Sequence, residues 1–102
     1  MNRADIWLAE VGGKRRPVLV LTRSEVIDVR RSITVAEITT QRRGSAVEVV
    51  LDVEIVGLER PSVVNCDGLH TVAQSRLTSL VGLVDDETMR RVCSSIAYAL
   101  SC

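Results

Sequence analysis

The residues of this sequence that are best suited to chemistry are cations at the edge of an apolar run. Lys14, Arg15 and Arg16 follow one another directly, and the apolar segment 17–21 begins immediately after them. A guanidinium group is charged at every physiological pH, and its planar fork of donors fits the oxygens of a phosphate or a carboxylate. The three cations are therefore either a solvated turn or a group held at a strand start to meet a negatively charged ligand.

Charge is distributed unevenly along the 102 residues, although their formal net charge is zero. Residues 1–45 hold nine Lys and Arg against five Asp and Glu, a net charge of +4, whereas residues 46–102 hold four against eight, a net charge of −4. Either this asymmetry is chance, or it presents a basic face to a partner. With one Trp, one Tyr and no Phe, any RNA contacts must come from guanidinium, hydroxyl and backbone groups rather than from an aromatic platform.

The sequence also excludes several classes of function. It has one histidine and no metal-binding motif, P-loop, dinucleotide-binding glycine motif or nucleophile elbow, so an enzyme of this kind would use no metal and no cofactor. Cys66, Cys93 and Cys102 cannot all pair within one chain, and we interpret them as reduced thiols. No apolar stretch is long enough for a membrane helix, and no secretory signal is recognisable. We therefore expect one domain over residues 1–102 in a cytoplasmic protein.

Alternating and β-branched segments predict short strands that must position the cations. The first covers residues 4–11, with Ile6, Leu8 and Val11 facing inward, and Gly12-Gly13 supplies the turn that follows. Further strands are expected at 17–22, 33–40, 46–51 and 62–67, with 70–72 as a candidate continuation of the last, and residues 80–84 are a short apolar segment. Residues 24–31 are expected to form a loop or short helix, 53–61 an irregular connection, and 74–77 one helical turn.

The last segment predicts an amphipathic helix. Asp85 can cap its N-terminus, and acidic residues follow where the helix dipole favours negative charge. Apolar residues then recur at spacings of three and four and form one stripe: Met89, Val92, Cys93, Ile96, Ala97 and Leu100. The sequence thus predicts a mainly β fold, in which antiparallel strands are closed by a C-terminal helix.

Several stretches occur in a specific order and spacing: ADIWLAEVG at 4–12, RRPVLVLTR at 15–23, VAEITTQ at 35–41, RPSVVNCD at 60–67 with HTV at 70–72, and LVDDETMRRV at 83–92. In this arrangement they resemble the MazF/PemK family of bacterial toxin endoribonucleases over nearly the whole chain. The resemblance implies a small SH3-like or CcdB-like antiparallel β-barrel, a homodimer, and a cognate antitoxin whose disordered segment occupies the RNA groove.

The same resemblance implies an activity. Single-stranded RNA would be cleaved sequence-selectively and without metal, through attack of a ribose 2′-hydroxyl on the adjacent phosphate, leaving a 2′,3′-cyclic phosphate and a 5′-hydroxyl. Such cleavage would inhibit translation and growth. The family's catalytic arginine falls on Arg16, which would stabilise the charge of the phosphorane and is a candidate proton donor. Its threonine falls on Thr39, which would hydrogen-bond the phosphate or the attacking hydroxyl. Otherwise, Arg16 is a surface arginine at a hairpin end and Thr39 an ordinary strand threonine.

Other polar residues are expected to bind RNA rather than to react. Thr40 and Gln41 follow Thr39 at the same edge, and Lys14 and Arg15 would attract phosphate, for which charge suffices without precise geometry. Arg23, Arg42 and Arg43 fit this role and a plain solvated turn equally well.

Two departures from the family pattern concern the site. Only Gly12 to Arg15 replace a longer first loop, so the lid over the substrate and any carboxylate on it are missing. Gly68 replaces an RNA-contacting glutamine and His70 replaces a cation. In an extended strand Gly68 and His70 share a face, so His70 would lie in the RNA groove and supply base contact or proton transfer, since imidazole exchanges protons near neutral pH. The alternative is a structural histidine. Glu37, on the face of Thr39, is a further candidate base.

Two other functions remain open from the sequence alone. One is a non-catalytic SH3-like RNA-binding module. The other is a CcdB-type gyrase poison, but such proteins act through an aromatic residue at the end of the C-terminal helix, whereas this chain ends in ALSC.

Overall fold

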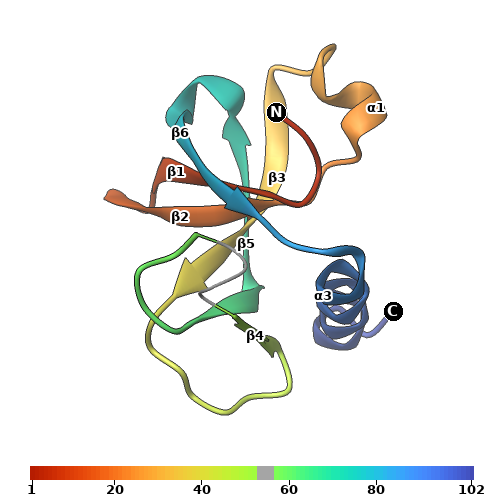
Figure 1. The fold of residues 1–102 in the computed structure, drawn as a ribbon. Coiled ribbons are helices and arrows are strands. Elements are labelled where there is room, and N and C mark those ends of the chain that lie inside the picture. The colour runs from red at the N-terminus through yellow and green to blue at the C-terminus, as the bar shows by residue number, and fades with distance from the viewer. Residues whose placement is uncertain (53–56) are drawn as a thin grey trace.

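The computed structural model describes residues 1–52 and 57–102. Its strands are β1 (Asp5–Val11), β2 (Lys14–Val20), β3 (Ser32–Thr39), β4 (Glu48–Leu51), β5 (Ser62–Ala73) and β6 (Leu77–Leu83), and its helical segments are α1 (Ser24–Ile27), η1 (Gln74–Arg76) and α3 (Asp86–Ala99) (Figure 1). The strands form one antiparallel sheet in the order β4-β5-β3-β2-β1-β6. This confirms the mainly β fold with a C-terminal helix. Within the described residues no ladder joins β4 to β6, so closure of the sheet into a barrel stays a prediction.

Strands β1 and β2 form a tight hairpin. Gly12 and Gly13 have φ angles of +61° and +76°, which glycine adopts without a Cβ clash, and Val11 pairs with Lys14 across them. Strand β2 therefore starts at Lys14 and not at residue 17 as predicted, because backbone pairing with β1 does not require apolar side chains. As a result, Arg16 stands opposite Ala9 on a paired strand rather than in a loop.

A bulge interrupts the ladder between β3 and β5. Ala36 pairs with Leu69, whereas the next residue, Glu37, pairs with Asn65. Three residues of β5, at positions 66–68, therefore have no partner in β3. Paired residues of an antiparallel ladder lie on the same face. Since Val35 pairs with His70 and lies on the face of Glu37, the bulge brings His70 and Asn65 onto the face that carries Glu37.

Apolar side chains are buried on both faces of the twisted sheet. One cluster is covered by α3 and includes Ile6, Leu19, Ala36, Ile38, Val64, Met89 and Val92. The other packs against α1 and includes Ala9, Val18, Val20, Ile27, Ile33 and Val35. Consecutive residues of β2 thus belong to opposite clusters, as predicted for a strand covered on both sides.

The predicted inward face of β1 is partly wrong. Ile6 and Val11 are buried, but Leu8 is only half-buried and Ala9 is buried in its place. Ile6 belongs to the cluster covered by α3, whereas Ala9 and Val11 belong to the cluster beside α1, so β1 buries residues on both faces rather than on a single inner face. Of the irregular connection predicted at 53–61, residues 53–56 lie outside the described residues and 57–61 contain no strand.

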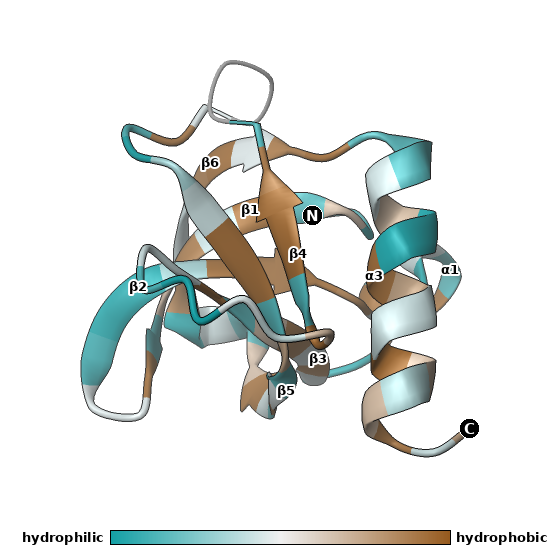
Figure 2. Ribbon diagram, turned by 90° about the horizontal axis from the view of Figure 1, so that it is seen from below, coloured by the Kyte–Doolittle hydropathy of each residue, from teal (hydrophilic) through white to brown (hydrophobic). Residues whose placement is uncertain are grey.

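Helix α3 is capped as predicted and lies beside the sheet next to β4 (Figure 2). The Thr88 backbone N–H donates to the Asp85 carboxylate at 2.8 Å. Only part of the predicted apolar stripe is used within the chain, because Met89 and Val92 are buried whereas Cys93 and Leu100 are exposed. No helix among the described residues is long and apolar enough to cross a membrane.

Candidate active site

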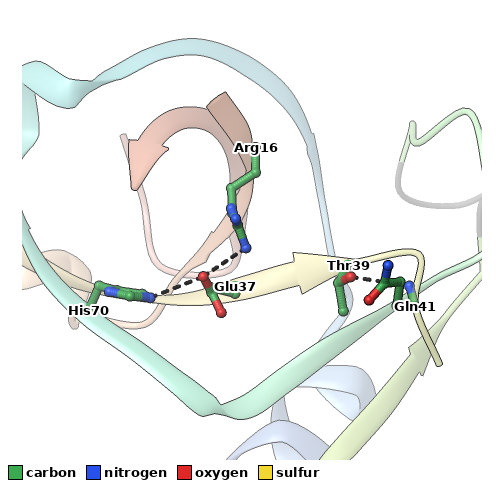
Figure 3. A network of polar contacts seen from close by, with 5 residues as sticks. All are labelled: Arg16, Glu37, Thr39, Gln41 and His70. Atoms are coloured by element: carbon green, nitrogen blue, oxygen red, sulfur yellow. Dashed lines mark hydrogen bonds and ion pairs between the residues drawn. The ribbon is translucent and has the colours of Figure 1, made fainter. Parts of the chain in front are cut away.

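A carboxylate lies at the centre of the polar cluster on β3. Arg16 Nη1 donates a hydrogen bond to Glu37 Oε1 at 2.8 Å, and His70 Nε2 lies 3.2 Å from the same oxygen without hydrogen-bond alignment. Figure 3 shows Glu37 between the guanidinium and the imidazole, with Thr39 and Gln41 further along the strand. The side chains of Arg16 and Glu37 are 26% and 20% exposed, so both can be reached from solvent.

Gly68 creates the space that the Glu37 carboxylate occupies. A Cβ at position 68 would lie 2.5 Å from Glu37 Oε2 and 3.0 Å from Asn65 Nδ2. Contacts this short do not occur between unstrained atoms, so the carboxylate keeps its place only because residue 68 has no side chain. A side chain at position 68 would therefore displace the Glu37 carboxylate.

Two adjoining hollows at the end of β3 share Arg16, Thr39 and Gln41 in their walls. The first is a cavity of about 310 Å³ that also contacts Glu37, Asn65 and Asp67. The second, of about 340 Å³, is bordered by Lys14, Arg15 and Thr40. All the predicted site residues except His70 therefore border one or both of these two hollows, although they come from β2, β3 and the turn after β3.

Arg16 and Thr39 each keep hydrogen-bonding capacity for a ligand. Arg16 Nη1 donates to Glu37 and Nε is buried without a partner among the described residues, so a bond from Arg16 to a ligand would come from its terminal nitrogens. The Thr39 hydroxyl accepts from the Gln41 backbone N–H at 3.1 Å, which leaves its own proton free to be donated. A phosphate in these hollows would meet a fixed positive fork and a hydroxyl donor.

The remaining predicted site residues have distinct surroundings. Arg15 Nη2 lies 3.5 Å from the Thr78 hydroxyl across β1, at the rim of the second hollow. His70 lies on the far side of Glu37 and borders neither hollow, so its contact with RNA stays a prediction. Within the described residues no group of three or more His, Cys, Asp and Glu side chains is placed to hold a metal ion.

The central position of Glu37 was only weakly visible in the sequence. Alternation placed it on the face of Thr39, which gave the candidate base, but nothing in the spacing indicated that it contacts both Arg16 and His70. The sequence feature that could have revealed it is the combination of Glu37 with Gly68, whose missing side chain leaves room for the carboxylate. The two residues can be matched only when the bulge in β5 is known, and the sequence pattern does not show that bulge.

Known proteins that resemble this chain belong to one family. Residues 2–100 match the family model of the PemK-like, MazF-like toxin of type II toxin–antitoxin systems. The probable endoribonuclease MazF5 of Mycobacterium tuberculosis is 38% identical over 103 residues, covering 98% of this chain and 93% of the relative. The structure of Mycobacterium tuberculosis toxin MazF-mt6 superposes with a TM-score of 0.89 at 37% identity, covering 95% of this chain and 96% of that one.

A third relative shares the fold. A mycobacterial endoribonuclease solved in complex with its cognate antitoxin is 22% identical, with a TM-score of 0.89, and covers 99% of this chain and 95% of that chain. The relatives confirm the class of enzyme expected from the sequence, an endoribonuclease. The chain belongs to the PemK-like, MazF-like family of toxins of type II toxin–antitoxin systems.

Proposed function

We propose that this toxin cleaves single-stranded RNA without a metal ion, by attack of a ribose 2′-hydroxyl on the adjacent phosphate. The products are a 2′,3′-cyclic phosphate and a 5′-hydroxyl. One observation carries the proposal: Arg16 and Thr39 share the walls of two adjoining hollows, so one phosphate can contact both side chains. The hollows continue past Lys14, Arg15, Thr40 and Gln41, along which the flanking nucleotides would lie.

Arg16 stabilises the negative charge that develops on the phosphorane. Glu37 holds one of its terminal nitrogens on β3, which orients the guanidinium before the substrate arrives. Preorganised donors lower the barrier because they need no reorientation during the reaction. Arg16 was also a candidate proton donor, but a guanidinium keeps its protons in proteins, so in this proposal the leaving 5′-oxygen takes its proton from water.

Thr39 positions the reacting groups. Its hydroxyl is fixed by the Gln41 backbone N–H and donates to the phosphate or to the attacking hydroxyl. Lys14 and Arg15 supply positive charge at the rim, which raises affinity for the RNA backbone and makes binding salt-dependent. Base contacts from Gln41 would make the cleavage sequence-selective, and cleavage of cellular RNA would inhibit translation and growth.

The proposal includes two protein partners. A cognate antitoxin would place a disordered segment over the same hollows, which makes inhibition competitive with RNA. A second copy of this chain would cover the apolar face at the end of α3, where Tyr98 and Leu100 are 68% and 59% exposed. Beside it lies the largest hollow, about 570 Å³, whose wall includes Leu21, Val26 and Leu69.

Cleavage of a long unstructured RNA in EDTA tests the enzymatic proposal. We expect fragments with 5′-hydroxyl and 2′,3′-cyclic phosphate ends, and no cleavage when the nucleotide at the scissile position is a 2′-deoxynucleotide. Arg16→Ala should lower the rate by about 10²–10³-fold. Arg16→Lys should restore little of it, because an ammonium lacks the planar fork.

The matched control is Arg76→Ala, which removes an exposed arginine of η1. We expect it to cleave at the rate of the unaltered protein. Intact RNA that still binds the protein would support the non-catalytic RNA-binding alternative, and cleavage abolished by EDTA would contradict a metal-independent reaction.

A further inference from the structure

We infer that Glu37 is the general base of the proposed RNA cleavage, the group that takes the proton from the attacking 2′-hydroxyl. The inference rests on the proposed function and assigns the one role in it that neither Arg16 nor Thr39 can fill. A guanidinium has no lone pair to accept a proton, and a neutral hydroxyl is a poor base. A carboxylate within reach of the substrate is the standard solution to this chemistry.

Glu37 lies where a base for Arg16 and Thr39 must lie. It precedes Thr39 by two residues on β3, so both side chains lie on one face of the strand. Its carboxylate borders the same 310 Å³ hollow as Arg16 and Thr39. A ribose whose phosphate contacts Arg16 in this hollow can therefore place its 2′-hydroxyl against Glu37.

The two oxygens of the carboxylate have different surroundings. Oε1 accepts from Arg16 Nη1 at 2.8 Å and lies 3.2 Å from His70 Nε2. Oε2 lies over Gly68, and no described residue donates a hydrogen bond to it. The first oxygen therefore holds the carboxylate in place while the second remains available to accept a proton. His70 acts through Glu37 in this arrangement and is a positioning residue.

The step is balanced in protons and bonds. The 2′-hydroxyl proton passes to Glu37 Oε2 as the bond from the 2′-oxygen to phosphorus forms. The bond from phosphorus to the 5′-oxygen then breaks, and this oxygen takes a proton from water. The hydroxide that remains removes the proton from Glu37, which regenerates the carboxylate.

Substitution of Glu37 tests the inference through the pH dependence of kcat. We expect Glu37→Gln to lower kcat by about 10²–10⁴-fold with a small change in KM. The rise of kcat with pH on the acidic side, which we expect for the unaltered protein, should disappear. Glu37→Asp should recover that rise at a reduced kcat. The charged or titratable groups around Glu37 are Arg16 from β2, His70 and Asp67 from β5, and Arg43 and Glu48, which line the same hollow.

Gly68→Ala tests the role of the Glu37 carboxylate without changing Glu37 itself. Its Cβ would collide with Glu37 Oε2, the end of a flexible side chain, so the carboxylate must move while the backbone stays. We expect a melting temperature close to that of the unaltered protein and a kcat at least about 10-fold lower. The matched control for lost negative charge is Glu25→Gln, an exposed acid of α1 outside both hollows.

The possible outcomes distinguish failure of the inference about Glu37 from failure of the proposed RNA cleavage. If the unaltered protein cleaves RNA and Arg16→Ala does not, but Glu37→Gln keeps the normal kcat and pH profile, Glu37 is not the base and only this inference fails. If Glu37→Gln is slow but retains the acidic rise, Glu37 only positions Arg16, and the inference fails again. If the unaltered protein leaves RNA intact, the proposed function itself fails, and this inference fails with it.

Discussion

At the scale of single residues, the Glu37 carboxylate contacts two side chains that can carry positive charge, Arg16 and His70. Arg16 and Glu37 are each at least one-fifth exposed, and ion pairs with such access to water stabilise a fold by about 0.2–1 kcal/mol. The pair is therefore too weak to explain the structure of the sheet, which rests on its apolar clusters. Substitutions at Arg16 or Glu37 should change activity far more than stability, which is what makes them usable as tests.

The role of His70 can be separated from that of Glu37 by a double-substitution cycle. His70→Ala should lower kcat by about 10-fold, because Glu37 Oε1 loses one of the groups that hold it. If His70 acts only through Glu37, His70→Ala combined with Glu37→Gln should be no slower than Glu37→Gln alone. Unchanged cleavage by His70→Ala, measured at equal folding, would remove His70 from the mechanism.

Thiol reactivity is a second property of single residues. Cys66 is fully buried, and burial, together with the nearby charge of Asp67, raises the pKa of its thiol to about 11. Since the thiolate is the reactive form, Cys66 should not react with an aromatic disulfide reagent in the native protein at pH 8. Cys93 and Cys102 are exposed in the single chain and should react at once in the monomeric Leu100→Asp variant, in which no second copy covers them. We expect two fast thiols and a third only in denaturant; three fast thiols would show that the α3 face of the sheet opens readily.

At the scale of elements, the sequence predicted strands correctly where apolar and polar residues alternate regularly. It missed strand boundaries that are set by backbone hydrogen bonds alone. The segments at 33–40 and 62–72 were found because apolar side chains mark both. The start of β2 was missed because three cations continue the ladder, and the start of β4 because residues 46 and 47 belong to the preceding loop, where Glu48 accepts from the Arg43 and Ser45 backbone N–H groups. Polar residues that pair only through backbone hydrogen bonds produce no apolar–polar alternation from which a strand boundary could be predicted.

Docking of α3 depends on a few buried side chains. Val92 is fully buried between the helix and the sheet, and Val92→Ala removes two methyl groups from a packed site. We expect a loss of about 2 kcal/mol in the free energy of unfolding, from lost transfer energy and the cavity left behind. Val29→Ala makes the same change at a side chain that is 81% exposed and should cost under about 0.5 kcal/mol. Denaturant unfolding of both variants checks the difference.

The N-terminal cap of α3 makes the stability of the protein depend on pH in the acidic range. Hydrogen bonds from the Thr88 side chain and backbone lower the pKa of Asp85 below its ordinary value of 3.8. A carboxyl group whose pKa is lower in the folded state contributes stability above its unfolded pKa and loses it as the pH falls through the folded value. Asp85→Asn keeps a capping oxygen without the charge, so its melting temperature should be lower at pH 7 and should converge with that of the unaltered protein below pH 3.8. A constant difference across this range would contradict the charge-based explanation.

At the scale of the whole molecule, the sheet buries apolar residues on both faces but leaves half of the α3 stripe uncovered. The sequence predicted that stripe as continuous, because helical spacing cannot show which turns of a helix meet the sheet. Met89 and Val92 are buried in the cluster that also includes Val49 of β4 and Val64 of β5, whereas Leu100 is 59% exposed. An apolar helix end of this kind is typical of a surface that a second copy covers.

Sedimentation equilibrium tests the proposed homodimer. The unaltered protein should have twice the mass of one chain, and Leu100→Asp should shift the population towards monomer at the same concentration, because a desolvated charge opposes association. Val29→Asp introduces the same charge at an exposed residue outside the largest hollow and should remain dimeric. A monomeric unaltered protein at micromolar concentration would rule out the homodimer.

The convergence of the site could be predicted only in part from the sequence. Resemblance placed Arg16 and Thr39 at neighbouring strand ends, and both border the same hollows. The contact of Glu37 with His70 could not be predicted, because an uninterrupted ladder would set Glu37 opposite Asn65 and leave residue 70 on the other face. Three unpaired residues in β5 change that register, and no pattern of side-chain types shows such a bulge.

That bulge also sets which changes in chain length the protein can accept. The three residues at 66–68 have no partner in β3, so one residue inserted there can lengthen the bulge while Asn65 and Leu69 keep their pairing. One residue inserted between two paired residues, such as Thr71 and Val72, would instead turn every later side chain of β5 to the other face. Changes in chain length should therefore be tolerated at the bulge and destabilising within the regular ladder, which an insertion series would reveal directly.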